Sequence, residues 1–296
     1  MTVRFRRAAA AALFLPLLLS GCRFTTRRLP IPKAPSIEQT VSPEALVARL
    51  NRRWEALRTL TAKVDVQASE LKTKEGLAKD YTSFPAIIMI RKPEMLRVYA
   101  RIPVIGTCLF DLASDGKTFT LLVPRRNNKV IQGSNTLKTK SASQMENMRP
   151  GFFLDAMTVR GLEPDDLYSV TADTVTVEDA VRKHIYSVPR YILSISRRNP
   201  DSQRLAPVRV VYFHRDDLLP YQQDVYDSEG NLETQVVYSG YRDFGAGKYP
   251  SAVTIVRPLE EYRINLAVND VKENQPLSDD QFVVKIPDGA AIQKLE

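Results

Sequence analysis

Alternating apolar and polar residues mark the stretch from Ile87 to Val123 as the clearest structural signal in this chain. In Met95–Ile102 every second residue is apolar, and a period of two is typical of a β-strand with one buried and one solvated face. Cys108–Leu112 and Phe119–Val123 continue the pattern, and Asp115-Gly116 between them is a typical hairpin turn. We therefore expect three or four consecutive strands here.

The same alternation extends to both sides of this central meander. Upstream it predicts strands at Thr61–Ser69 and Tyr81–Arg91. Between the meanders, Thr171–Val177 has strand composition, whereas Val177–Lys183 is also compatible with a helical turn. Because consecutive strands with short links pair with their neighbours, the pattern predicts an antiparallel sheet. The remaining expected strands are Tyr186–Arg197, Val208–Arg215, Pro220–Tyr226, Glu233–Tyr241, Ser251–Arg257 and Tyr262–Val271.

Two segments have helical rather than strand spacing. Ser42-Pro43-Glu44 is a typical helix start, and apolar residues then recur every three or four positions from Leu46 to Leu57. Ala142–Met157 is rich in Met and Phe, and Pro150-Gly151 in its middle predicts a kink or two short helices. We therefore predict the α+β class: a curled antiparallel sheet, or half-open β-barrel, with α-helices covering its concave side.

The N-terminus has the features of an export signal. Arg4, Arg6 and Arg7 precede an apolar run, Ala8–Leu19, that is too short to span a bilayer. The run ends in Leu19-Ser20-Gly21-Cys22, which matches the bacterial lipobox. This resemblance implies that Cys22 becomes the first mature residue and carries acyl chains, and several chains anchor a protein stably. The alternative is an ordinary signal peptide that happens to contain a cysteine.

Composition divides the chain into three parts. Residues 1–21 are the expected signal peptide, 22–40 a lipidated Pro-rich tether and 41–296 a folded domain of ordinary apolar and charged content, 44% and 26% for the whole chain. Removing the signal peptide takes away three arginines and lowers the formal charge from +8 to +5. Basic runs with interleaved aromatic residues do not occur, so we expect no nucleic-acid partner. Arg23 follows the lipobox cysteine where an Asp would retain a lipoprotein at the inner membrane, which favours the periplasmic face of the outer membrane.

Residues for covalent chemistry are few. The two histidines, His184 and His214, lack metal-ligand spacing, and there is no nucleophile elbow, phosphate loop or dinucleotide fingerprint. With Cys22 acylated, Cys108 has no disulfide partner and lies on an apolar strand face, where a thiol behaves as a small hydrophobe. We expect no enzymatic activity, metal or cofactor.

The order of a helix, a meander, a Met- and Phe-rich helix and a second meander resembles the bacterial lipoprotein carriers LolA and LolB. The similarity is greatest to LolB, which is itself an outer-membrane lipoprotein. In that family an Asn-Pro-Leu-Gly turn projects a leucine into the membrane, and Ile102–Thr107 occupies the corresponding position with two β-branched residues and no leucine. Val237–Tyr241 followed by Pro250 is similar to a late strand and turn of LolB. The resemblance covers about Pro43–Pro287.

This resemblance implies a lipid-anchored protein that binds acyl chains of lipoproteins or lipids and takes part in their transfer to the outer membrane, with a periplasmic carrier protein as a further partner. Transfer of alkyl surface, about 25 cal/mol per Å², would drive binding. An alternative is a structural or stress-sensing envelope lipoprotein that binds a protein partner in the same groove. The expected groove residues are Leu96, Val98, Phe110, Leu112, Phe119 and Leu121, closed by Phe152, Phe153 and Met157.

The groove residues and the apolar turn each have an alternative interpretation as ordinary packing residues. Met and Phe stripes pack protein cores more often than they line ligand sites. In the turn formed by Pro103, Val104, Ile105 and Gly106, the two apolar side chains either insert into the membrane or pack back onto the sheet. Full burial of both in lipid would contribute roughly 3–5 kcal/mol, which orients a domain but does not anchor it.

Cys22→Ser tests the predicted anchor. Because the acyl chains supply the membrane affinity, we expect the variant to accumulate as soluble periplasmic protein or as uncleaved precursor. Fractionation and N-terminal sequencing measure this. Processing of the variant at the same bond with full retention in the membrane fraction would contradict the lipoprotein interpretation.

Overall fold

The structure is a computed structural model that describes residues 39–72, 76–124, 128–135, 149–179, 184–199, 204–245 and 247–295. The expected signal peptide, Cys22 and all but the last two residues of the expected tether lie outside this range. No helix in the described part of the chain combines the length and apolarity needed to cross a membrane.

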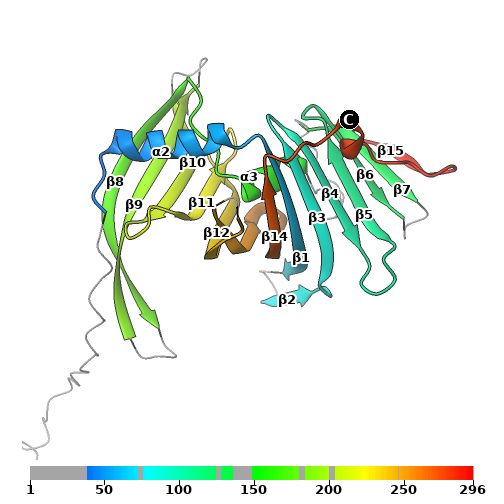
Figure 1. Ribbon diagram of the computed structural model, residues 1–296, viewed down its shortest axis with the longest axis horizontal. Coiled ribbons are helices and arrows are strands. Elements are labelled where there is room, and N and C mark those ends of the chain that lie inside the picture. The colour runs from blue at the N-terminus through cyan, green and yellow to red at the C-terminus, as the bar shows by residue number, and fades with distance from the viewer. Residues whose placement is uncertain are drawn as a thin grey trace, which may run out of the picture. The chain divides into compact units, whose positions relative to one another are not determined.

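One curled sheet that does not close into a barrel dominates the fold (Figure 1). Its strand order is β15-β7-β6-β5-β4-β3-β1-β14-β13-β12-β11-β10-β9-β8, and β2 pairs with β1. The strands are β1 Thr59–Lys72, β2 Leu77–Asp80, β3 Phe84–Arg91, β4 Met95–Arg101, β5 Cys108–Ser114, β6 Thr118–Val123, β7 Lys129–Ser134, β8 Asp166–Asp179, β9 His184–Arg198, β10 Leu205–His214, β11 Pro220–Tyr226, β12 Leu232–Asp243, β13 Lys248–Arg257, β14 Tyr262–Glu273 and β15 Ile292–Lys294.

Pairing within the sheet follows the predicted meanders, with one addition. The central meander β3–β7 is antiparallel throughout, in register from Ala86↔Ala100 to Val123↔Lys129. The sheet is mixed rather than purely antiparallel, because β15 returns from the C-terminal segment and pairs parallel to β7. Residues 177–179 belong to β8, which continues to Asp179, so they do not form the helical turn considered for Val177–Lys183. Residues 180–183 lie outside the described range.

The described part of the chain contains two α-helices, α2 Pro43–Ala56 and α3 Pro150–Met157, and two short 3₁₀ helices, η4 Pro258–Glu260 and η5 Asp279–Phe282. α2 begins as predicted: the Ser42 hydroxyl accepts a hydrogen bond of 3.2 Å from the Ala45 amide. For Ala142–Met157, the extended Arg149 excludes a single kinked helix, whereas the alternative of two short helices is tested only for its second piece. Pro150 is the first residue of α3, where a missing N–H costs nothing, and residues 141–148 lie outside the described range.

Both helices pack against apolar side chains of the sheet. Phe152, Phe153 and Met157 of α3 belong to one buried cluster with strands β1, β3–β6 and β12–β14. α2 contributes Leu46 and Leu50 to a second cluster with apolar residues of β9 and β10. Strand faces agree with the alternation, since the even-numbered residues of β4 are the buried ones.

The described residues fall into two compact units. Ser36–Val175 and Pro189–Glu296 form the larger one, which holds both helices and all strands except the outer part of the β8–β9 hairpin. That outer part, Thr176–Val188, belongs to the other unit. All site residues discussed below lie in the larger unit.

Candidate functional site

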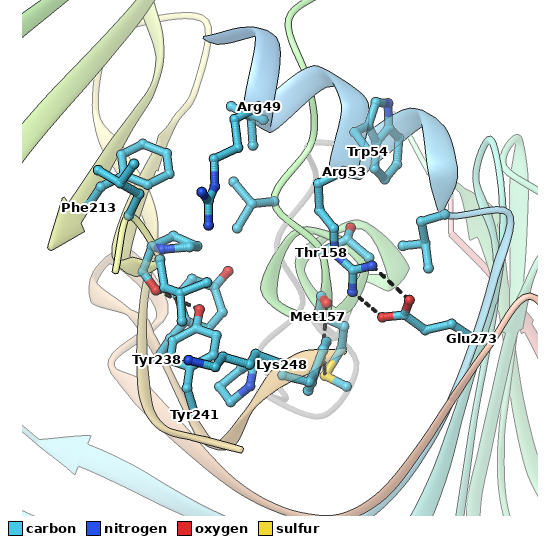
Figure 2. Close-up of a pocket in the computed structure, with 18 of the residues that line it drawn as sticks. Arg49, Arg53, Trp54, Met157, Thr158, Phe213, Tyr238, Tyr241, Lys248 and Glu273 are labelled. Carbon is cyan, nitrogen blue, oxygen red and sulfur yellow. Dashed lines mark hydrogen bonds and ion pairs between the residues drawn. The ribbon is translucent and has the colours of Figure 1, made fainter. Parts of the chain in front are cut away.

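A cavity of about 290 Å³ lies beside α2, within the larger unit (Figure 2). Its walls come from segments far apart in sequence: α2, the end of α3, the β10–β11 turn, β12, the start of β13 and the end of β14. This volume is near the lower limit for small-molecule sites. The lining residues are Leu46, Arg49, Leu50, Arg53, Trp54, Leu57, Met157, Thr158, Val159, Phe213, Leu218, Leu219, Pro220, Tyr238, Tyr241, Lys248, Tyr249, Pro250 and Glu273.

Three tyrosines make the wall apolar because their hydroxyls are bonded to other groups. Tyr249 donates to the Met157 carbonyl and Tyr241 to the Pro220 carbonyl, each at 2.6 Å. The Tyr238 hydroxyl accepts a bond of 2.7 Å from the Gln223 amide. Burial raises the pKa of all three phenols, so they stay protonated at neutral pH. The rings therefore present hydrocarbon to the cavity.

Charged side chains gather at the cavity too. Arg53 holds the Glu273 carboxylate with both guanidinium nitrogens, one of them at 2.8 Å. The Glu273 side chain is 6% exposed and that of Arg53 46%. Arg49 donates to the Asp217 backbone carbonyl at 3.2 Å, and Figure 2 shows Arg49 and Lys248 extending toward the space from α2 and β13.

Side chains tie the last turn of α3 to the sheet through its carbonyl groups. Gln223 of β11 donates to the Asp155 carbonyl and Tyr249 of β13 to the Met157 carbonyl. At the other end of α3, Arg149 makes no side-chain capping hydrogen bond, and its guanidinium lies 5.2 Å from the centroid of the Phe119 ring. Met157 belongs to both the cavity lining and the buried cluster, as do Leu57, Tyr238 and Tyr249, so the cavity adjoins the cluster at the end of α3.

The nine predicted groove residues come together in the cluster under α3. Leu96, Val98, Phe110, Leu112, Phe119 and Leu121 are all buried, with Phe152, Phe153 and Met157 of α3 packed on them. In this state their space is filled by side chains, and Met157 alone of the nine lines the open cavity. A role for this cluster in acyl binding stays a prediction.

Sequence reasoning missed most of the cavity. Its tyrosines lie in Val237–Tyr241 and beside Pro250, the segments whose similarity to LolB was noted, but their spacing alone does not identify a wall. The apolar stripe of α2 was a second sign of the cavity, but an ambiguous one. A helix that packs on a core and a helix that lines a ligand site require the same apolar residues. The cavity forms only when α2 meets strands β10–β14.

The β4–β5 loop projects into solvent. Val104 is fully exposed and Ile105 is 67% exposed, so neither packs on the sheet. The Ile105 amide bonds to the Pro103 carbonyl at 2.8 Å and the Gly106 amide to the Ile102 carbonyl at 2.9 Å, which closes a tight turn. Val104 has φ = 68°, a conformation that is rare and strained for a β-branched residue.

The loop lies at the opposite end of the strands from Glu273 of the cavity. Register relates Ala100, just before the loop, through Ala86 of β3 and Val64 of β1 to Val268 of β14. Glu273, which lines the cavity, is instead related through Leu60 and Ile90 to Leu96, at the other end of β4. The buried cluster joins the two, since it runs from Leu57 and Tyr249 to Ala100 and Phe110.

The other candidate groups are placed as follows. Burial raises the pKa of the half-buried Cys108 thiol to about 11, which keeps it protonated at neutral pH. His214 stacks on Tyr221 with ring centroids 4.3 Å apart, and the His184 side chain lies outside the described residues. Among described residues, His, Cys, Asp and Glu form no group able to hold a metal ion.

No protein-family model and no curated protein matches the sequence. Similar solved structures include a LolA superfamily protein from Nitrosomonas europaea, with 12% identity, a TM-score of 0.49 and 83% of this chain and 99% of that chain covered. A DUF1329 family protein from Desulfovibrio piger has 15% identity and a TM-score of 0.49, with 81% and 95% covered. A putative outer membrane lipoprotein-sorting protein domain from Vibrio parahaemolyticus has 10% identity and a TM-score of 0.43, with 80% and 94% covered.

The family that the sequence resembles is thus named among its structural neighbours. With TM-scores below 0.5, these likenesses by themselves assign neither a ligand nor a location to the chain.

Tyr249→Phe tests whether polar bonds hold the end of α3. The change leaves the buried Met157 carbonyl without its donor, so we expect the free energy of unfolding to fall by about 1–3 kcal/mol. Amide hydrogen exchange in α3 should accelerate by more than in β4. Tyr99→Phe on the opposite, solvated face of the sheet is the matched control and should change neither quantity. Equal protection of α3 in both variants would show that packing alone holds the helix.

Proposed function

We propose that this chain is a membrane-anchored periplasmic lipoprotein that binds acyl chains and takes part in lipid or lipoprotein transfer to the outer membrane. The observation that supports it is a largely apolar cavity of about 290 Å³ that adjoins a larger buried apolar cluster, on which one short helix, α3, is packed. No reacting group is needed, because alkyl surface moves between apolar environments at about 25 cal/mol per Å².

In this proposal the cavity is where an acyl chain first binds. Its walls are hydrocarbon from Leu46, Leu50 and Trp54 on one side and tyrosine rings on the other. A longer chain would need more space than the cavity offers. The adjacent space is filled by α3, which has eight residues and would not be a stable helix in isolation.

Displacement of α3 would extend the cavity into a groove. Phe152, Phe153 and Met157 would leave the cluster and an acyl chain would replace them against Leu96, Val98 and Phe119, so apolar contacts are exchanged rather than lost. In this proposal both helices cover the concave side of the curled sheet before a ligand binds, and α3 moves away when the acyl chain enters. The cost of moving α3 is offset by the burial of the chain.

The projecting loop would contact the membrane at the other end of the groove. Val104 and Ile105 bury hydrocarbon there, and the strained turn holds both side chains clear of the sheet. An acyl chain received at the cavity from a periplasmic carrier would leave near Ala100 and Phe110, beside the loop. Acyl chains on Cys22 would hold the domain at the outer membrane throughout.

Val104→Asp with Ile105→Asp tests this route. Because both side chains are exposed, we expect the double variant to keep its fold, its anchor and its affinity for a fluorescent acyl probe. Delivery of the probe to liposomes should slow at least tenfold, as expected when roughly 3–5 kcal/mol of membrane contact is removed. Stopped-flow transfer measures the rate.

Leu259→Asp, an exposed apolar residue of η4, is the control for adding charge and should deliver at the normal rate. Normal delivery by the loop variant would remove the loop from the mechanism. Failure of the unaltered protein to bind any acyl probe would contradict the proposed function itself.

A further inference from the structure

Positive charge exceeds negative charge among the residues that line the cavity. Arg49 and Arg53 come from α2 and Lys248 from β13, whereas Glu273 of β14 is the single acid in the lining. Figure 2 shows the three cations around the same space as the tyrosine rings. A ligand in this cavity therefore meets hydrocarbon inside and cations at the rim.

Arg53 and Glu273 neutralise each other. The bidentate pair satisfies a carboxylate that is 6% exposed, and removal of either partner would leave a buried charge. Arg53 thus has a structural role, and the excess charge resides on the other two cations.

Arg49 and Lys248 have no such partner. Within the described ranges, neither side chain has a carboxylate at ion-pair distance. Arg49 donates one bond, to the Asp217 backbone carbonyl at 3.2 Å, and a guanidinium has further N–H donors to offer. The nearby Asp217 carboxylate accepts the Leu219 amide at 2.8 Å within its own turn.

The hydroxyl groups that line the interior are already hydrogen-bonded within the protein. The hydroxyls of Tyr241 and Tyr249 are bonded to backbone carbonyls, and that of Tyr238 to Gln223. Polar atoms of a bound amphiphile must therefore stay at the rim, beside two unpaired cations. An uncharged head group leaves both cations unused, whereas an anionic one forms charge-assisted hydrogen bonds with them.

We infer that the cavity selects an anionic amphiphile, with one alkyl chain among the tyrosine rings and a phosphate or carboxylate head group held by Arg49 and Lys248. This rests on the proposed binding of acyl chains and narrows it. The acylated amino terminus of a lipoprotein carries an uncharged amide, so the inferred cargo is an anionic lipid.

Isothermal titration calorimetry on the full-length Cys22→Ser chain, without detergent, compares C12 probes of different charge below their micellar concentrations. We expect dodecyl phosphate to bind at least tenfold more tightly than uncharged monolauroylglycerol, a factor that corresponds to about 1.4 kcal/mol. Dodecyltrimethylammonium should bind more weakly than either. Millimolar inorganic phosphate should not displace dodecyl phosphate, because it has no chain to bury.

Variants assign the preference to the two residues. Arg49→Ala with Lys248→Ala should bring dodecyl phosphate to within about twofold of monolauroylglycerol and leave the affinity for the latter unchanged. Arg49→Lys with Lys248→Arg should restore most of the preference. Arg52→Ala with Lys117→Ala removes the same charge from exposed positions outside the lining and should keep the full tenfold preference.

Each contrary result has a distinct meaning. Equal binding of charged and uncharged chains by the unaltered cavity overturns this inference and leaves the proposed function standing. Displacement by inorganic phosphate alone indicates an anion site without a chain, and also overturns it. Loss of the uncharged probe in the alanine variant would show that these residues shape the cavity rather than recognise charge. Binding of no probe at all overturns both proposals.

Discussion

The apolar face of an unclosed sheet has to be covered, and this constraint governs the rest of the structure. A closed barrel would bury that face by itself, but here the sheet ends at β15 and β8 without pairing them. α3 packs on apolar side chains of both meanders, with Phe152, Phe153, Leu154, Ala156 and Met157 in the buried cluster. The position of this helix therefore sets both the boundary of the cavity at Met157 and the packing of the buried cluster.

The two helices are held by different means, and this difference matters for the proposed function. α2 has a side-chain cap at Ser42 and an ion pair from Arg53 to Glu273. α3 has eight residues against the 14 of α2, and its N-cap residue makes no side-chain capping bond. It is held by hydrophobic contacts and by hydrogen bonds from Gln223 and Tyr249 to its last turn. A short helix that depends on its contacts can be replaced by a ligand that offers equivalent contacts. α3 is therefore the more suitable of the two to move.

The sequence predicted local structure better than it predicted the site. Period-two alternation identified the strands and their faces, because burial of Leu96, Val98 and Phe119 follows from the pattern itself. The parallel pairing of β15 was missed, since three residues carry too little pattern and parallel pairing needs a distant partner. For the second helical segment, α3 begins at Pro150, as the alternative of two short helices expects of its second piece, and a first piece would lie outside the described residues.

The cavity was beyond sequence reasoning for a related physical reason. Its wall is assembled from six separate segments, and most of their lining residues would equally suit a packed core. The exposed loop was easier to predict, since a Pro and a Gly bracket two apolar residues within a tight turn. The placement of the loop opposite Glu273 of the cavity follows from register, which the sequence does not specify over such distances.

The central claim is that an acyl chain occupies the space beside α2, and Trp54 offers a direct test because it is the single tryptophan of the chain and lines that space. Bromine quenches tryptophan fluorescence only at short range. Titration with a brominated fatty acid should therefore quench Trp54 saturably at one chain per protein, and the unbrominated acid should reverse the quenching by competition. Quenching that is absent, or that grows without saturation and resists competition, would contradict the account.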